Sequence, residues 1–313
     1  MVSRPAFVLI VCCLSFGTSA VPVRGDEDAP LPPDAPDNRV MVVTRVPLGA
    51  VLEFSETNGS WKWIAAAKGW INESHVVPIG RAIQHFDARV KNEPSSQTFH
   101  ERGIARVALG QHEAAIEDFS EAIKREDSNL AAVNDRGNAH RYLGNADAAI
   151  SDFSRVIDGD VKHPGVFVNR GLARQMKGML DKAIDDFNAA IQLDPKFAPA
   201  WEAGGSSRYE SGDFTKAYQN YRKAIEIDPN FARALNNLAW MLAVCPDEHY
   251  LDGAEAVRLA TKACQLAEFQ DAGFLDTLAA AHAENGQFEQ AVIRAKEAIE
   301  KADDKRKSDI RER

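Results

Sequence analysis

The sequence lacks an excess of positive charge. Its 37 lysines and arginines are outnumbered by 46 aspartates and glutamates, which gives a formal net charge of −9. Because lysine and arginine supply most of the affinity for a phosphate backbone, this balance argues against a nucleic-acid partner. The only dense basic run, Lys305-Arg306-Lys307, lies among acidic residues near the end of the sequence. We therefore expect residues 303–313 to form a solvated, charged tail.

Motifs typical of enzymes and of metal sites are also missing. The sequence contains no Gly-x-Ser-x-Gly, no Walker loop, no His-Glu-x-x-His and no Cys-x-x-Cys. Its eight histidines are scattered singly along the chain. The sequence therefore predicts no catalytic residue, no bound metal and no cofactor.

Long apolar runs are absent beyond the first twenty residues. Within them, Ala6–Phe16 is mostly apolar, but a helix that spans a bilayer core of about 30 Å needs roughly 20 residues. Arg4 precedes this run and Thr18-Ser19-Ala20 follows it, which is typical of a secretory signal and its cleavage site. We predict that residues 1–20 are a signal peptide and that the mature protein is exported, periplasmic or extracellular, with no membrane span.

Residues 21–38 and 39–80 differ from each other in composition. The first segment contains DEDAPLPPDAPDN, which is acidic and rich in proline, so we predict an extended linker. The second segment carries apolar runs that each fit a strand of three to five residues. These runs are Val40–Val43, Val51–Phe54, Trp61–Ile64, Gly69–Ile71 and His75–Val77.

The order of these runs resembles a bacterial SH3-like (SH3b) domain. The resemblance rests on the Asn58-Gly59 turn, on Trp61-Lys62-Trp63 and on Gly69-Trp70-Ile71. An Asn-Gly pair tolerates positive φ and suits a tight hairpin. The resemblance implies a small all-β barrel over residues 39–80.

From Ser96 onward the sequence repeats itself every 34 residues. The repeated positions hold glycine, glycine, alanine and an aromatic residue. They are Gly103, Gly137, Gly171 and Gly205; Gly110, Gly144, Gly178 and Gly212; Ala115, Ala149, Ala183 and Ala217; Phe119, Phe153, Phe187 and Tyr221. This pattern resembles the tetratricopeptide repeat (TPR), a helix–turn–helix unit of 34 residues. The small residues allow two helices to cross closely, and we expect the aromatic residue to fill the interface with the next unit.

The resemblance implies a mostly α fold, in which helical hairpins stack into a superhelix (an α-solenoid) after the β-barrel. The expected units are 96–129, 130–163, 164–197, 198–231, 232–271 and 272–302. The last two are degenerate, and the fifth carries an insertion. Residues 81–95 fit a lone second helix, which we expect to cap the first unit.

Cysteine is scarce. Cys12 and Cys13 lie in the predicted signal peptide, where a lipid anchor is an alternative, although bulky Ile10-Val11 stand where lipoprotein cleavage prefers a small residue. Cys245 and Cys264 lie on the two helices of the fifth unit, roughly 15 Å apart along the helix axis. A disulfide tolerates about 7 Å between Cα atoms, so we expect two buried free thiols.

An arginine in each first helix is matched by an aspartate sixteen residues later in the first three units. The pairs are Arg102 and Asp118, Arg136 and Asp152, and Arg170 and Asp186. In the fourth unit both residues change together, to Gly204 and Asn220. We therefore favour structural ion pairs within each hairpin over a ligand-binding row of arginines.

The TPR resemblance also indicates which side chains line the inner surface, namely first-helix positions near two, five, nine, twelve and thirteen. In the second to fifth units they include Asn134, Asn138, Arg141, Tyr142, Gln175, Glu202, Tyr209, Asn236 and Trp240. Asparagine both donates to and accepts from a peptide backbone, and aromatic side chains supply anchoring area. The alternative is a generic solvated groove. A carboxylate clamp is not predicted, because His100 and Ile104 occupy the positions of its Lys and Asn.

These observations predict an exported, non-catalytic TPR scaffold that binds a protein or peptide through its concave groove. The competing class is attachment to the cell wall, in which the SH3-like domain binds peptidoglycan and the repeats present a partner. An enzyme would need a site with converging titratable groups, which the sequence does not reveal.

Overall fold

A computed structural model of the protein describes the backbone of residues 7–11, 51–54, 56–58, 61–64, 69–72 and 76–302, and the side chains of residues 82–302. The chain divides into two compact units, Met1–Gly159 and Asp160–Arg313. The predicted linker 21–38, the predicted strand 40–43 and the predicted tail 303–313 lie outside the described residues.

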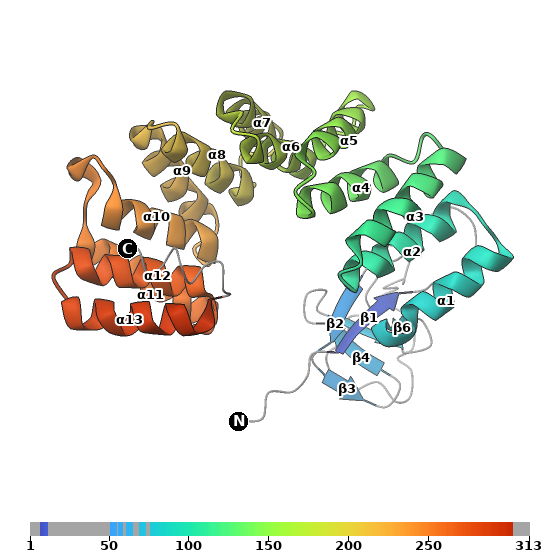
Figure 1. The fold of residues 1–313 in the computed structure, drawn as a ribbon, viewed down its shortest axis with the longest axis horizontal. Helices are drawn as coiled ribbons and strands as arrows, with labels where there is room; N and C mark the ends of the chain where they lie inside the picture. The colour runs from blue at the N-terminus through green and yellow to red at the C-terminus, as the bar shows by residue number, and fades with distance from the viewer. Residues whose placement is uncertain are drawn as a thin grey trace, which may run out of the picture. The chain divides into compact units, whose positions relative to one another are not determined.

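In the first unit, the described residues before α1 (Ile79–Asn92) form short strands in two antiparallel sheets, and Figure 1 labels β1, β2, β3, β4 and β6 among them. The strand order is β2-β1-β6 in one sheet and β3-β4-β5 in the other. The strands are β1 (Phe7–Val11), β2 (Val51–Phe54), β3 (Glu56–Asn58), β4 (Trp61–Ile64), β5 (Gly69–Asn72) and β6 (Val76–Pro78).

The sequence did not predict β1, because its residues belong to the predicted signal peptide. Ile10 pairs with Val51 of β2 on one side and with Val77 of β6 on the other. Consecutive apolar residues fit a buried strand as well as they fit the core of a signal, so composition alone does not separate the two. A closed SH3-like barrel is not visible in this arrangement. The signal peptide and the barrel therefore stay predictions.

Helices α1 to α5 follow in the first unit (Figure 1). They are α1 (Ile79–Asn92), α2 (Ser96–Ala108), α3 (His112–Arg125), α4 (Leu130–Tyr142) and α5 (Ala146–Asp158). Helix α1 begins two residues before the predicted lone helix, and its fully buried Ala82 and Phe86 pack with Ala105 of α2. Helices α2–α3 and α4–α5 each form a hairpin within one expected repeat.

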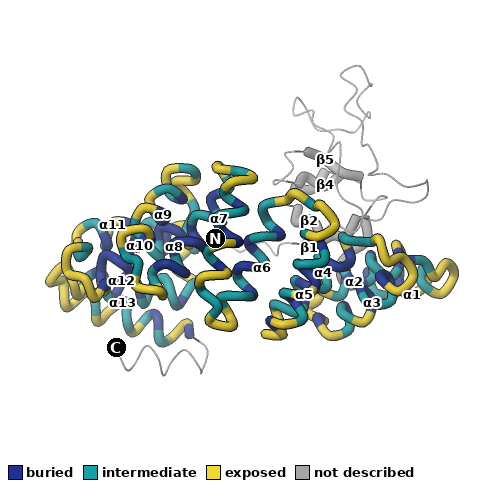
Figure 2. Tube along the Cα trace, turned by 90° about the horizontal axis from the view of Figure 1, so that it is seen from above, coloured by how far each residue is buried: buried dark blue, intermediate teal, exposed yellow. Residues whose placement is uncertain are grey.

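The second unit contains four further hairpins, α6–α7, α8–α9, α10–α11 and α12–α13. Figure 2 shows buried and exposed residues alternating along these helices, as expected for amphipathic helices. The helices are α6 (Pro164–Met176), α7 (Leu180–Leu193), α8 (Ala198–Glu210), α9 (Phe214–Ile227), α10 (Ala232–Val244), α11 (Gly253–Leu266), α12 (Ala272–Glu284) and α13 (Phe288–Lys301). A short 3₁₀ helix, η3 (Glu248–Tyr250), occupies the predicted insertion.

Each hairpin of the first four repeats closes around a glycine and an aromatic ring. A Cβ atom built on Gly137 would lie 2.9 Å from Phe153, and one on Gly205 would lie 2.7 Å from Tyr221. The rings therefore fill their own hairpin as well as the next interface, where the cluster around Phe119 also contains Ala139. The turn glycines after the first helices, such as Gly144 with φ +81°, adopt the left-handed region that glycine tolerates best.

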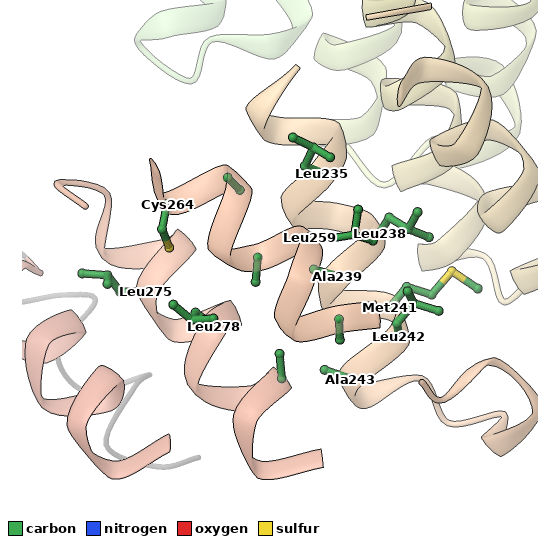
Figure 3. Packing of buried hydrophobic residues seen from close by; sticks show 14 of the residues in the cluster. Leu235, Leu238, Ala239, Met241, Leu242, Ala243, Leu259, Cys264, Leu275 and Leu278 are labelled. Carbon is green, nitrogen blue, oxygen red and sulfur yellow. The ribbon is translucent and has the colours of Figure 1, made fainter. Parts of the chain in front are cut away.

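The largest hydrophobic cluster belongs to the second unit. Figure 3 shows side chains of α10, α11 and α12 meeting there, among them Leu238, Leu259 and Leu278, which are at most 2% exposed. Cys245 and Cys264 belong to the same cluster, and both are free thiols. Burial raises the pKa of the Cys264 thiol to about 11.

Candidate partner-binding surface

Three arginine–aspartate pairs join the two helices of a hairpin. The Nη2–Oδ1 distances are 2.6 Å in Arg102–Asp118, 2.7 Å in Arg136–Asp152 and 2.7 Å in Arg170–Asp186. In each pair the arginine Nε also donates to the carboxylate, so the contact is bidentate. The aspartates are buried, so each of these arginines forms an ion pair with the aspartate of its own hairpin.

A second arginine reaches the same aspartate in two of these hairpins. Arg106 Nη1 lies 3.0 Å from Asp118, and Arg174 Nη1 lies 2.8 Å from Asp186. In α4 the equivalent residue is His140, whose pKa is lowered chiefly by burial. Asp152 therefore depends on Arg136 more than its counterparts depend on theirs.

The fourth repeat replaces the pair by a different contact. Arg208 fills the space of the missing side chain, because a Cβ atom on Gly204 would lie 3.0 Å from its Nη1. With the Asn220 amide turned so that its oxygen faces this guanidinium, Nη1 donates to it at 2.8 Å. Nη2 donates to Asn188 at 3.0 Å. Gly204 leaves the space that the Arg208 guanidinium occupies, and Asn220 replaces the aspartate as its hydrogen-bond acceptor.

Three of the predicted surface residues line one cavity in the first unit. Asn138, Arg141 and Tyr142 of α4 face it. The cavity measures about 340 Å³, and its apolar wall comes from Ile104, Val107, Phe119 and Ala139. It is large enough to take a side chain of a bound segment.

His112 is a lining residue of this cavity that the sequence did not single out. It is 8% exposed, and its ring stacks on Tyr142 with centroids 3.8 Å apart. Its Nδ1 is buried and has no hydrogen-bond partner among the described residues. His112 and Tyr142 are 30 residues apart in the sequence. This spacing does not match the 34-residue period, so the sequence did not predict that the two rings stack.

Asn134 and Asn236 occupy the fifth position of their helices, α4 and α10. Each donates to the next residue of its own helix, at 3.2 Å to Asp135 and 3.5 Å to Asn237. Each has a buried Oδ1 atom without a partner among the described residues. These two amides are half-buried, so their backbone-binding capacity is partly used.

Glu202, the fifth residue of α8, lies inside a helix–helix interface. It is 3% exposed. Arg233 Nη2 approaches to 2.6 Å, and Asn237 donates at 2.8 Å, both from α10. Burial raises the pKa of the Glu202 carboxyl, although Arg233 opposes this shift. Arg233 and Asn237 come from the next repeat, and Ser206 of α8 donates to the same carboxylate at 3.3 Å, so Glu202 lies in the interface between two repeats.

The remaining predicted residues of the second unit lie on α6, α8 and α10. Gln175 donates to Glu210 at 2.6 Å. Tyr209 packs on Phe214 with ring centroids 5.4 Å apart, and its hydroxyl is hydrogen-bonded to Trp240. Trp240 also lines a cavity of about 770 Å³ formed by α10, α12 and α13.

This larger cavity is lined mostly by residues that the position rule did not include. Ala279, Ala280 and Ala283 come from α12, and Ala291, Val292 and Ala295 come from α13, whereas Ala243 and Val244 stand at positions twelve and thirteen of α10, which the rule does cover. The rule considers only first helices of the second to fifth repeats.

Over the described residues, no group of three or more His, Cys, Asp or Glu is arranged to hold a metal ion. In the same part of the chain, no helix has the length and apolar character needed to cross a bilayer.

Comparison with known proteins gives the following likenesses. Tetratricopeptide-repeat models match residues 100–164, 165–197 and 205–240. The Cut9–Hcn1 hetero-tetramer of the APC/C is similar over 75% of this chain and 46% of that chain, with 14% identity and a TM-score of 0.64. A tetratricopeptide repeat protein from Parabacteroides merdae is similar over 67% and 81%, with 18% identity and a TM-score of 0.53.

YrrB, a TPR protein with an unusual peptide-binding site, is similar over 60% of this chain and 94% of that chain, with 16% identity and a TM-score of 0.46. No curated protein matches the sequence. At these identities the solved structures show the fold alone. The repeated hairpins, their glycine–aromatic contacts and the three matched segments together establish that this chain contains tetratricopeptide repeats.

Proposed function

We propose that this protein is a non-catalytic scaffold that holds a segment of another protein on the face made by the first helices of its hairpins. One observation carries the proposal: packing positions repeat their residue type, whereas the ninth residue of the first helix does not. The ninth residues are Ile104, Asn138, Leu172, Ser206 and Trp240, and all five are half-buried. Packing does not fix the residue type at this position, so the residue type there can vary with the partner that is recognised.

The cavities support the same proposal. The ninth residue lines the cavity of about 340 Å³ in the first unit, as Asn138, and the cavity of about 770 Å³ in the second, as Trp240. Each site combines an apolar wall with a few polar side chains, which is the usual composition of a recognition pocket.

Site-specific photo-crosslinking in the source cell tests the proposal. A photoreactive residue is placed at Asn138 or at Trp240. Lys124 of the second helix α3 and Lys223 of the second helix α9, whose side chains are 78% and 40% exposed, are the controls. We expect the same partner at both test positions and at neither control. Equal crosslinking at all four positions, or at the controls alone, would contradict the proposal.

We further propose that the scaffold is exported after cleavage behind Ala20. N-terminal sequencing of the protein from the exported fraction tests this, and a mature chain that still begins near Met1 would exclude it.

The alternative role, attachment to peptidoglycan, rests on the SH3-like pattern of residues 39–80. Sedimentation of the full chain with purified peptidoglycan, compared with a chain lacking residues 39–80, decides between the two.

A further inference from the structure

The cavity at the α12–α13 end of the second unit is apolar and acidic at once. Nine of its eleven lining residues are alanine, valine or tryptophan. The other two are Asp276 and Glu284, so the charged groups among its lining residues are carboxylates. An occupant that complements this cavity is apolar where it enters and basic beside that point.

Helices α11 and α13 are the second helices of successive hairpins. The face that α11 buries is partly exposed on α13. Ala256 and Ala260 of α11 are fully buried in the cluster that α12 shares. Ala291 and Ala295 lie 35 residues further on, at the same positions of α13, and both line the cavity and are partly exposed. Among the described residues, no helix therefore covers the surface of α13 that corresponds to the one α12 covers on α11.

Large apolar side chains of α13 and α10 are exposed, and two of them, Val244 and Val292, line the cavity. Phe288, Val292 and Ile293 of α13 are 68%, 53% and 44% exposed, and Val244 of α10 is 37% exposed. Contiguous exposed apolar area of this kind marks an interaction site in soluble proteins.

A polar contact recurs where one first helix receives the next. At two of these interfaces the fifth residue of a first helix contacts the sixth residue of the following one: His100 lies 2.8 Å from Asp135, and Glu202 accepts from Asn237 at 2.8 Å. Arg233, the second residue of α10, also reaches Glu202. Asp276 is the fifth residue of α12, so an incoming helix would place its second and sixth residues near this carboxylate.

We propose that the α12–α13 end is a seat for an amphipathic helix of another protein, laid down as a further first helix. The helix carries apolar residues at its fourth, seventh, eighth and eleventh positions, as α10 does, and an arginine or lysine at its second or sixth. In α10 the apolar set is Leu235, Leu238, Ala239 and Leu242. This inference rests on the proposed scaffold function and names the class of partner for the second unit.

The chain's own residues 303–313 do not supply this apolar set. Their sequence, DDKRKSDIRER, contains Ile310 as its single large apolar residue. A seat of this length needs three or four apolar residues spaced along one helix face.

A peptide with the sequence of α10 is the test probe, because α10 fills the equivalent seat on α8 and α9. It is fused to a soluble carrier, labelled, and titrated with the full chain by fluorescence anisotropy. We expect saturable binding, which Ala283→Trp weakens at least about tenfold by filling the cavity. The matched control is Ala254→Trp, the same change at an exposed alanine of α11 outside the cavity, and it should bind as the wild type does.

A charge swap tests the recognition of Asp276. Asp276→Lys should weaken binding about three- to fivefold, as expected for a partly exposed ion pair. A probe in which the arginine copied from position 233 is glutamate should bind the wild type equally weakly and recover with Asp276→Lys. Glu300→Lys, at an exposed position on α13 outside the cavity, is the charge control. Circular dichroism confirms that each variant is folded.

Three results would overturn the inference. The first is absence of saturable probe binding, or equal binding by Ala283→Trp and Ala254→Trp. The second is a wild-type dimer in sedimentation that Ala283→Trp dissociates, which would assign the seat to a second copy. The third is a tenfold gain in probe affinity on deleting residues 303–313, which would assign it to the tail. Each leaves crosslinking at Asn138 in the first unit unaffected, so the scaffold proposal is judged separately.

Discussion

Gly171 of α6 and Phe187 of α7 leave no room for a methyl group between them. A Cβ atom at position 171 would lie 2.5 Å from Cε1 of the ring, and Phe187 is fully buried. The same relationship joins Gly103 to Phe119, at 2.4 Å. The glycine is therefore a requirement of hairpin packing, although it weakens the helix that contains it.

Gly171→Ala should destabilise the protein. Replacing a helical glycine by alanine gains about 0.5–1 kcal/mol in propensity, but overpacking a core costs about 1–3 kcal/mol. The steric cost exceeds the gain in helix propensity because the ring is enclosed. We therefore expect the free energy of unfolding, measured with urea, to fall by about 1–2 kcal/mol. Phe187→Leu in the same chain should recover part of this loss, since the smaller side chain frees the space. Additive effects of the two changes would contradict the assigned contact.

Arg136→Ala should destabilise the protein more than Arg170→Ala does. Both changes remove a bidentate partner from a buried aspartate, but Arg174 still reaches Asp186 at 2.8 Å. Asp152 has no second arginine, because His140 stands in that position. We expect about 2–3 kcal/mol for Arg136→Ala and about 1 kcal/mol for Arg170→Ala. Urea unfolding of both variants measures the difference, and the reverse order would show that the second arginine does not compensate.

The two cysteines of the second unit should resist alkylation while the protein is folded. The thiolate is the reactive form, and burial raises the pKa of Cys264 to about 11 and raises that of Cys245 as well. At pH 8 with iodoacetamide, peptide mass spectrometry should find Cys264 modified more slowly than Cys245, and both modified quickly in urea. Rapid modification of Cys264 in the folded chain would contradict its placement in the core.

Glu202 should make the protein less stable as pH rises. Its folded-state pKa is raised, chiefly by burial, above an unfolded value of about 4.3. A raised pKa contributes stability that is fully present below the unfolded value and is lost as pH rises through the folded value. Urea unfolding from pH 4 to pH 7 should therefore show the wild type losing stability relative to Glu202→Gln. The opposite trend would mean that Arg233 outweighs the desolvation of the carboxylate.

The repeated hairpins were predictable because their packing problem is the same each time. Phe153 and Gly137, like Gly205 and Tyr221, stand sixteen residues apart and meet wherever two antiparallel helices of this length fold back. The arginine–aspartate pairing follows from the same spacing. Contacts within one hairpin can therefore be predicted from the 34-residue period alone, without information on the neighbouring repeats.

Contacts between repeats were harder to predict, because the period says nothing about which polar residues meet. The position rule placed Glu202 among the residues that line the groove, whereas it is 3% exposed and contacts Arg233 and Asn237 of the next hairpin. The stack of His112 on Tyr142 and the cavity beside α13 depend on the particular residues at each interface. The SH3-like barrel remains a prediction from residues 39–80, since the described side chains begin at residue 82.

The contact of Glu202 with Arg233 and Asn237 also means that the hairpins are not interchangeable modules. If the hairpin α10–α11 were deleted and α12 took its place, the second and sixth residues of the new neighbour would be Gly273 and Thr277. The carboxylate would lose its only cation and its amide donor in one step, although every glycine–aromatic contact would survive. Gain or loss of whole repeats during evolution is therefore constrained by a few buried polar groups that dictate which hairpin can follow which.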